Sequence, residues 1–269
     1  MAPKIQWPLV LFSMLAGCGG CAFAFAGIAN AMGESISVTL FVTIVAFVLV
    51  VVGAICSMMH LATPKHAFAA VTHLLSFSGI SVELIMLGVV CALMALFAGS
   101  IVFIGNATAT LVLGMLGALS GVVLAFVTGH GYVISAKAAW FTEILPIAYL
   151  GTSLAAGALL FLLVSLAADK EFSAKPWGVP VVAASIVGAV TIVAYLAYLQ
   201  SAGFDVASQA LVTGLAVACG IVVAIGCSLA LLRCAAGGNR QTLTVLAAVG
   251  FVGALAGGLA VRMLMWLFS

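Results

Sequence analysis

Eight long apolar runs, separated by short polar connections, take up almost the whole of this 269-residue chain. Only 5% of the residues are charged, whereas a soluble globular domain has about 25%. A run of about 18 or more apolar residues can cross a bilayer as a helix, and barrel strands would instead alternate over about ten residues. The pattern predicts an all-α polytopic membrane protein with about eight transmembrane helices in a bundle.

The expected spans fill one integral membrane domain, residues 1–269. By hydropathy they lie at about 7–31, 36–60, 80–104, 108–128, 144–168, 178–200, 207–232 and 242–267. An even number of spans puts both termini on one side of the membrane, together with the two longest connections, 61–79 and 129–143. In the first of these, Pro64 suits the start of a short interfacial helix over about 65–75.

The distribution of basic residues gives a small bias for orientation. Three lie on the side of the termini and four on the opposite side: Lys4, Lys65 and Lys137 against Lys170, Lys175, Arg233 and Arg240. The positive-inside rule therefore places both termini outside. The net charge of +2 gives no sign of nucleic-acid binding, and there is no phosphate-binding loop.

The sequence indicates no metal, iron-sulfur or haem site in this chain. Cys18 and Cys21 have the CxxC spacing, but they lie in mid-helix with no second pair, and a cluster needs four thiolates. A buried haem needs axial histidines inside the bilayer. All four histidines instead lie near one surface: His60, His66, His73 and His130.

Ionisable side chains inside a bilayer are costly, so each is a candidate for function. Four lie near the side of the termini: His60, Glu83, Glu143 and Arg262. His60 ends the second expected span, where the helix dipole favours a protonated imidazole. Glu83 lies about one turn into the third span, where apolar surroundings bring a carboxyl group toward the range in which it exchanges protons near neutral pH. His60 and Glu83 could accept the two protons that a quinol loses when it is oxidised.

The alternatives to a quinol site stay open at this point. His60 could simply reach the interface while Glu83 pairs with a neighbouring group. In a proton-coupled small-solute transporter, Glu83 and Glu143 would carry protons, although transporters more often place polar groups at the midplane. A third possibility is a structural anchor without quinone chemistry. In the second long loop, Tyr132 could donate a hydrogen bond to a quinone oxygen, and Trp140 suits the interfacial aromatic belt.

Several short stretches resemble the membrane anchor subunit of dimethyl sulfoxide (DMSO) reductase, the DmsC family. They are Trp7 to Leu9, Ser57 to Leu61 followed by Pro64 and by Ala67 with Phe68, and Ser81 to Glu83. The resemblance is strongest over the first third of the chain. Tyr132 and Arg262 match more loosely, and Glu143 has no counterpart in the family pattern.

The resemblance implies a subunit of the bacterial inner membrane that oxidises menaquinol as its bound substrate. Electrons would pass directly to a four-cluster iron-sulfur subunit and then to a molybdopterin catalytic subunit, so this chain is not catalytic alone. The family's quinol-site histidine falls on His60 and its acidic residue on Glu83, and Tyr132 and Arg262 complete the candidate pocket. The final electron acceptor is not encoded here, because the anchor never touches it.

Overall fold

The structure, a computed structural model, describes residues 5–59, 79–235 and 237–269. Their regular structure is entirely helical. The long helices are α1 (Trp7–Ala31), α2 (Ile36–Met58), α4 (Gly79–Gly99), α5 (Ala107–His130), α6 (Ile144–Ala168), α7 (Gly178–Ser201), α8 (Ala210–Val217), α9 (Ala224–Cys234) and α10 (Arg240–Leu267). The predicted His60 site residue and the predicted interfacial helix at 65–75 lie outside the described residues.

Short 3-10 and π-helical segments extend some of these helices. They are the 3-10 helices η3 (Lys175–Trp177) and η4 (Val206–Gln209) and the π-helices η2 (Ser100–Ile104) and η5 (Ala218–Val223). Together the described residues form eight helices long and apolar enough to cross a membrane. This confirms the predicted fold class, and the observed ends differ from the expected ones by a few residues.

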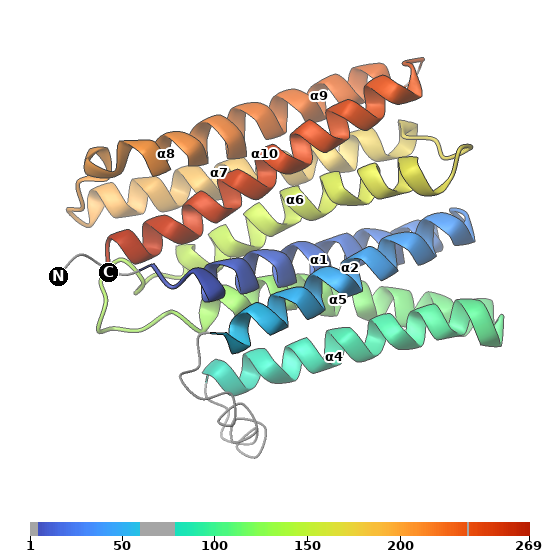
Figure 1. Cartoon of the computed structure of the whole chain (residues 1–269), viewed down its shortest axis with the longest axis horizontal. Coiled ribbons are helices and arrows are strands. Elements are labelled where there is room, and N and C mark those ends of the chain that lie inside the picture. Colours follow the sequence, from blue (N-terminus) through green and yellow to red (C-terminus); the bar gives the residue numbers. More distant parts are fainter. Residues whose placement is uncertain (1–4, 60–78, 236) are drawn as a thin grey trace.

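Short turns and side-chain caps define where α2 and α5 begin, at the end of the bundle opposite the chain termini (Figure 1). The Ser35 hydroxyl accepts a hydrogen bond from the first turn of α2, and the Asn106 side chain does the same for α5. Gly33 and Gly105 turn the chain just before these caps with φ angles of +82° and +64°, which glycine adopts without strain. The apolar runs are therefore folded back on one another through tight turns.

The α1 helix lies in the middle of the bundle and packs along α2, α5 and α6 (Figure 1). It begins at the same end of the bundle at which α10 stops. Its close approach to α5 depends on glycine. A Cβ atom at Gly27 would lie 2.2 Å from the Gly114 carbonyl oxygen, and one at Gly121 would lie 2.1 Å from the Gly20 carbonyl oxygen. Close packing of this kind holds membrane helices together, because lipid supplies no hydrophobic drive between them.

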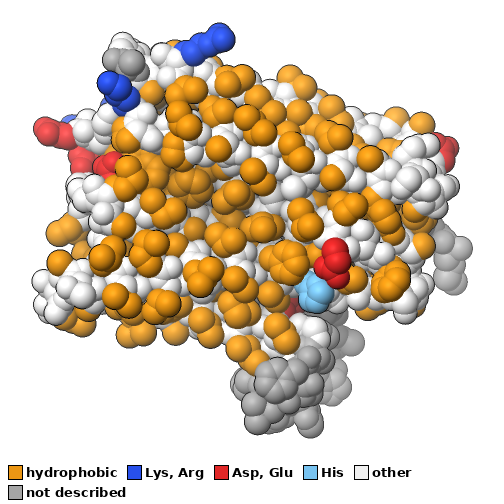
Figure 2. All heavy atoms as spheres, turned by 180° about the vertical axis from the view of Figure 1, so that it is seen from behind, with side chains coloured by type: hydrophobic (Ala, Val, Ile, Leu, Met, Phe, Trp, Pro, Cys, Tyr) orange, Lys and Arg blue, Asp and Glu red, His pale blue; other side chains and the backbone are white. Residues whose placement is uncertain are grey.

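Hydrophobic side chains cover the face of the bundle drawn in Figure 2, and charged side chains gather mainly at its two ends. Exposed residues along the helices include Phe103, Leu211 and Val222. Apolar side chains at such positions suit contact with lipid hydrocarbon. The chain is a multi-pass membrane protein.

The end of the bundle opposite the termini is tied by polar contacts between turns. The Trp177 indole N–H donates to Glu34 Oε1 at 2.8 Å, and the Ser35 hydroxyl donates to Asp169. That hydrogen bond, with one from the Glu171 backbone N–H, holds the pKa of Asp169 below its usual value. These contacts join the α1–α2 turn to the α6–α7 connection.

Candidate functional site

Arg262 is fully buried near the end of α10. Its Nε donates a hydrogen bond to Ser13 Oγ at 3.1 Å. Its Nη1 donates to Thr152 Oγ1 and to the Gly258 carbonyl, each at 3.0 Å. Its Nη2 donates to Ser153 Oγ at 3.0 Å and makes longer contacts with the Tyr149 and Ser13 carbonyls. Every donor nitrogen thus has a protein acceptor. Among the described residues no carboxylate forms an ion pair with Arg262. Arg262 can therefore act on a ligand through its positive charge, since its N–H groups are already used.

An aromatic cluster covers this arginine, and we define it as Tyr132, Trp140, Tyr149 and Trp266. The Arg262 guanidinium lies 4.2 Å from the centre of the Tyr149 ring. Ring centroids lie 6.1 Å apart for Tyr132 and Tyr149, 5.7 Å for Tyr132 and Trp140, and 4.8 Å for Trp140 and Trp266. The α5–α6 loop, which carries Tyr132 and Trp140, is thereby packed onto α6 and onto the end of α10.

Trp140 corrects one expectation from the sequence. Its side chain is only 5% exposed, and its indole N–H donates to the Met265 carbonyl at 2.7 Å. The Lys137 ammonium lies 3.8 Å from the centre of its ring. The prediction that Trp140 belongs to the interfacial aromatic belt is wrong, because the loop folds inward and the indole N–H finds an acceptor on α10.

The environment of Tyr132 keeps its phenol protonated. Burial is the largest cause, and negative charge on Tyr149 or Glu83 would add to it, so the pKa of Tyr132 is raised well above its usual value. The positive charge of Arg262 acts in the opposite direction and is the smaller effect. A protonated phenol is a hydrogen-bond donor, which is the role that the sequence predicted for Tyr132.

Glu83 lies in the first part of α4, beside the aromatic cluster. The residue as a whole is only half-buried, but its Oε1 atom is fully buried and has no hydrogen-bond partner in the part of the chain that the structure describes. Its charge is near enough to influence both Tyr132 and Tyr149. A buried carboxyl oxygen without a partner costs free energy. Glu83 Oε1 can therefore accept a hydrogen bond from a ligand or from a part of the chain outside the described residues.

The start of α4 reaches the cluster through a close contact with the end of α5. A Cβ atom at Gly79 would lie 3.3 Å from Gly131 Cα. Gly79 precedes Glu83 by one helical turn, and Tyr132 follows Gly131 directly. The close contact of Gly79 with Gly131 thus brings the Glu83 carboxyl group of α4 near the Tyr132 phenol of the α5–α6 loop.

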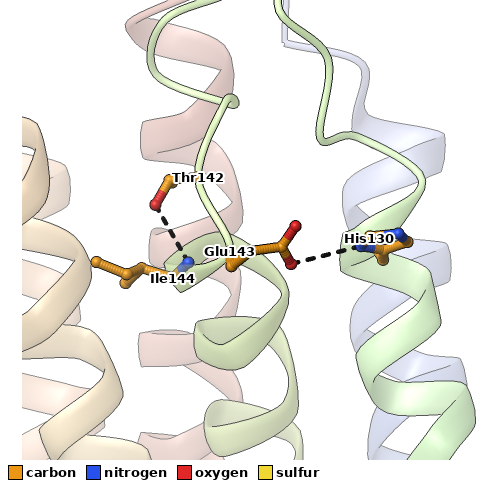
Figure 3. Close-up of polar contacts among 4 residues, drawn as sticks. All are labelled: His130, Thr142, Glu143 and Ile144. Carbon is orange, nitrogen blue, oxygen red and sulfur yellow. Dashed lines mark hydrogen bonds and ion pairs between the residues drawn. The ribbon is translucent and has the colours of Figure 1, made fainter.

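An exposed ion pair joins α5 and α6 at this end of the bundle. His130 Nδ1 lies 3.6 Å from Glu143 Oε2, and Figure 3 shows the two side chains pointing toward each other from the end of α5 and the start of α6. Their side chains are 55% and 65% exposed. A Cβ atom at Gly129 would lie 2.7 Å from Pro146 Cα, so the two helices are in close contact beside the pair.

The structure thus brings three of the four predicted site residues to one end of the bundle: Glu83, Tyr132 and Arg262. His60 follows the last described residue of the second span, Met59. Sequence reasoning missed Tyr149, which stands between the other groups. A tyrosine in the first turns of an otherwise apolar span was the available signal, because a buried hydroxyl needs a polar partner.

Cys18 and Cys21 are fully buried free thiols in α1. Across residues 5–59, 79–235 and 237–269, no three histidine, cysteine, aspartate or glutamate side chains come together as a group that could hold a metal ion.

Fold and site together define a polytopic helical membrane protein with a polar, aromatic-covered cluster at the end where α1 begins and α10 stops. The chain belongs to the DMSO reductase anchor subunit (DmsC) family, whose family model matches residues 1–267. A comparison with curated proteins finds no match. Membership extends the resemblance from the first third to essentially the whole chain and makes this protein a membrane anchor of a multisubunit DMSO reductase.

Proposed function

We propose that this chain is the quinol-oxidising anchor of its reductase complex in a bacterial inner membrane, with residues 1–269 as one membrane domain and both termini outside. It binds menaquinol, oxidises it, and passes the electrons directly to a four-cluster iron-sulfur subunit. That subunit supplies a molybdopterin catalytic subunit. The buried Oε1 atom of Glu83, which lies beside Tyr132 and Tyr149 and has no hydrogen-bond partner among the described residues, is the observation that carries this proposal.

Oxidation of a quinol requires two proton acceptors, and Glu83 and His60 take these roles. Each accepts a proton from one of the two hydroxyl groups as the electrons leave. Tyr132 donates a hydrogen bond to a quinone oxygen, because its raised pKa keeps the phenol protonated. Arg262 stabilises the negative charge that develops when a hydroxyl loses its proton, and a fixed charge in a water-poor site is effective at this.

Electron transfer in this proposal needs no carrier in the anchor itself. The candidate site lies at the end of the bundle that carries the α5–α6 loop, and this loop with the connection 61–79 forms the docking face for the iron-sulfur subunit. A cluster in the docked partner then accepts electrons directly from the bound quinol. No haem is involved in this chain.

The second candidate function is a structural anchor without quinone chemistry. It is favoured by one observation, the complete use of the Arg262 donors by protein acceptors. The transporter interpretation has less support, since the charged residues of the described spans lie toward the two ends of the bundle rather than at its middle (Figure 2).

Replacement of His60 by leucine separates the quinol-oxidising anchor from the structural anchor. We expect the His60→Leu complex to assemble at the wild-type level but to oxidise a reduced menaquinol analogue about 10²-fold more slowly, because one proton acceptor is gone. The measurement is the steady-state rate in membranes at equal amounts of assembled subunits. An unchanged rate would favour the structural anchor.

A further inference from the structure

Glu83 Oε1 is fully buried, so a proton that it accepts still has to reach water. Within the described residues, the exposed His130–Glu143 pair lies at the end of α5 that packs against the start of α4. His130 ends α5, and Gly131, the next residue, is in close contact with Gly79 on α4. The buried carboxyl group and the exposed imidazole are thus on neighbouring helices whose ends touch.

The turn after α5 also links His130 to Tyr132, the residue beside Glu83. The Tyr132 backbone N–H donates to the Gly129 carbonyl at 3.2 Å, and the Val133 N–H donates to the His130 carbonyl at 3.0 Å. Tyr132 is therefore held in the same tight turn as His130, and a negative charge on Glu83 would raise the pKa of its phenol.

The elements packed on α5, and the loop that follows it, carry a small set of charged and titratable groups. They are Glu83 and Cys91 on α4, Glu143 and Tyr149 on α6, Tyr132 and Lys137 in the α5–α6 loop, and the thiols Cys18 and Cys21 on α1, whose described span has no charged residue. Glu143 alone forms an ion pair with His130 in the described chain.

We propose that His130 and Glu143 form the proton-release site of this anchor, and this inference rests on the proposed function. One quinol O–H bond breaks and its proton goes to Glu83, the proton of the second hydroxyl goes to His60 as in the proposed function, and the two electrons leave for the partner's iron-sulfur centre. The proton then passes from Glu83 to the His130 imidazole, and the Glu143 carboxylate balances the new positive charge. Finally the imidazolium N–H bond breaks and the proton goes to water, which returns Glu83 and His130 to their starting states.

Chemical rescue of His130→Ala in the intact complex tests this proposal. We expect kcat for oxidation of a menaquinol analogue to fall about tenfold with KM unchanged, less than for a group that contacts the substrate, because water can partly replace an exposed relay. Added imidazole should restore much of the rate in His130→Ala and none in Glu83→Gln, whose acceptor is buried. His130→Gln should show the same fall, and it tests the proposal if the alanine variant assembles poorly.

Glu143→Gln should lower kcat in the same direction, and Glu171→Gln, an exposed carboxylate at the opposite end of the bundle, should leave it unchanged. A wild-type kcat in His130→Ala, or a loss that imidazole does not restore, would overturn the proton-release site while leaving quinol oxidation standing. A wild-type complex that fails to oxidise the quinol would instead overturn the proposed function, and this inference with it.

Discussion

The Glu83→Gln complex should lose quinol oxidation by about 10²-fold or more in kcat, with KM close to that of the wild type. Glutamine keeps the size of the side chain but cannot accept the proton. Since Glu83 Oε1 has no hydrogen-bond partner among the described residues, the change breaks no contact seen there, and assembly should be preserved. The measurement is the rate of menaquinol-analogue oxidation against substrate concentration, at equal amounts of assembled complex.

The matched control is Glu171→Gln, which removes a carboxylate from the exposed surface at the far end of the bundle. It should behave as the wild type. If Glu83→Gln also oxidises quinol at the wild-type rate, Glu83 is not a proton acceptor and the site proposed here is wrong.

Arg262→Met should lower quinol oxidation by roughly 10²-fold, an effect of the size seen when one stabilising group is lost from a preorganised site. The Arg262 guanidinium lies over the Tyr149 ring, and no carboxylate among the described residues forms an ion pair with it. Methionine has a similar length and no charge, so it fills the space without the electrostatic effect. Rates should again be compared at equal amounts of assembled complex.

Arg262→Lys distinguishes charge from packing. Lysine keeps the charge but cannot reproduce the planar set of hydrogen bonds to Ser13, Thr152 and Ser153. If the charge matters for oxidation, the lysine variant should be about tenfold or more faster than the methionine variant. Equal rates in these two variants would show that Arg262 serves only to hold α1, α6 and α10 together.

The fold could be predicted from sequence because a bilayer imposes one simple requirement on each span. Long apolar runs must be helices, and the turns at Gly33 and Gly105 mark where they reverse. The positions of Glu83 and Arg262 near one end follow from counting along such helices. The family pattern in the first third of the chain then pointed to the same end.

The contacts inside the site could not be predicted in this way. Whether the α5–α6 loop turns inward depends on the fit of Trp140 against the Met265 carbonyl, which no periodicity reveals. The hydrogen bonds of Arg262 join residues more than a hundred positions apart, such as Ser13 and Thr152. Spacing likewise gave no sign that His130 and Glu143 pair, because the loop between them could have followed many paths.

Photolabelling with an azido-substituted menaquinone analogue tests the central claim most directly. In the intact complex, the label should appear on peptides that contain Glu83, Tyr132 or Tyr149, and an excess of unlabelled menaquinol should abolish it. Label found only on lipid-facing residues such as Phe103 and Leu211, and unaffected by menaquinol, would contradict a quinol site at this end of the bundle.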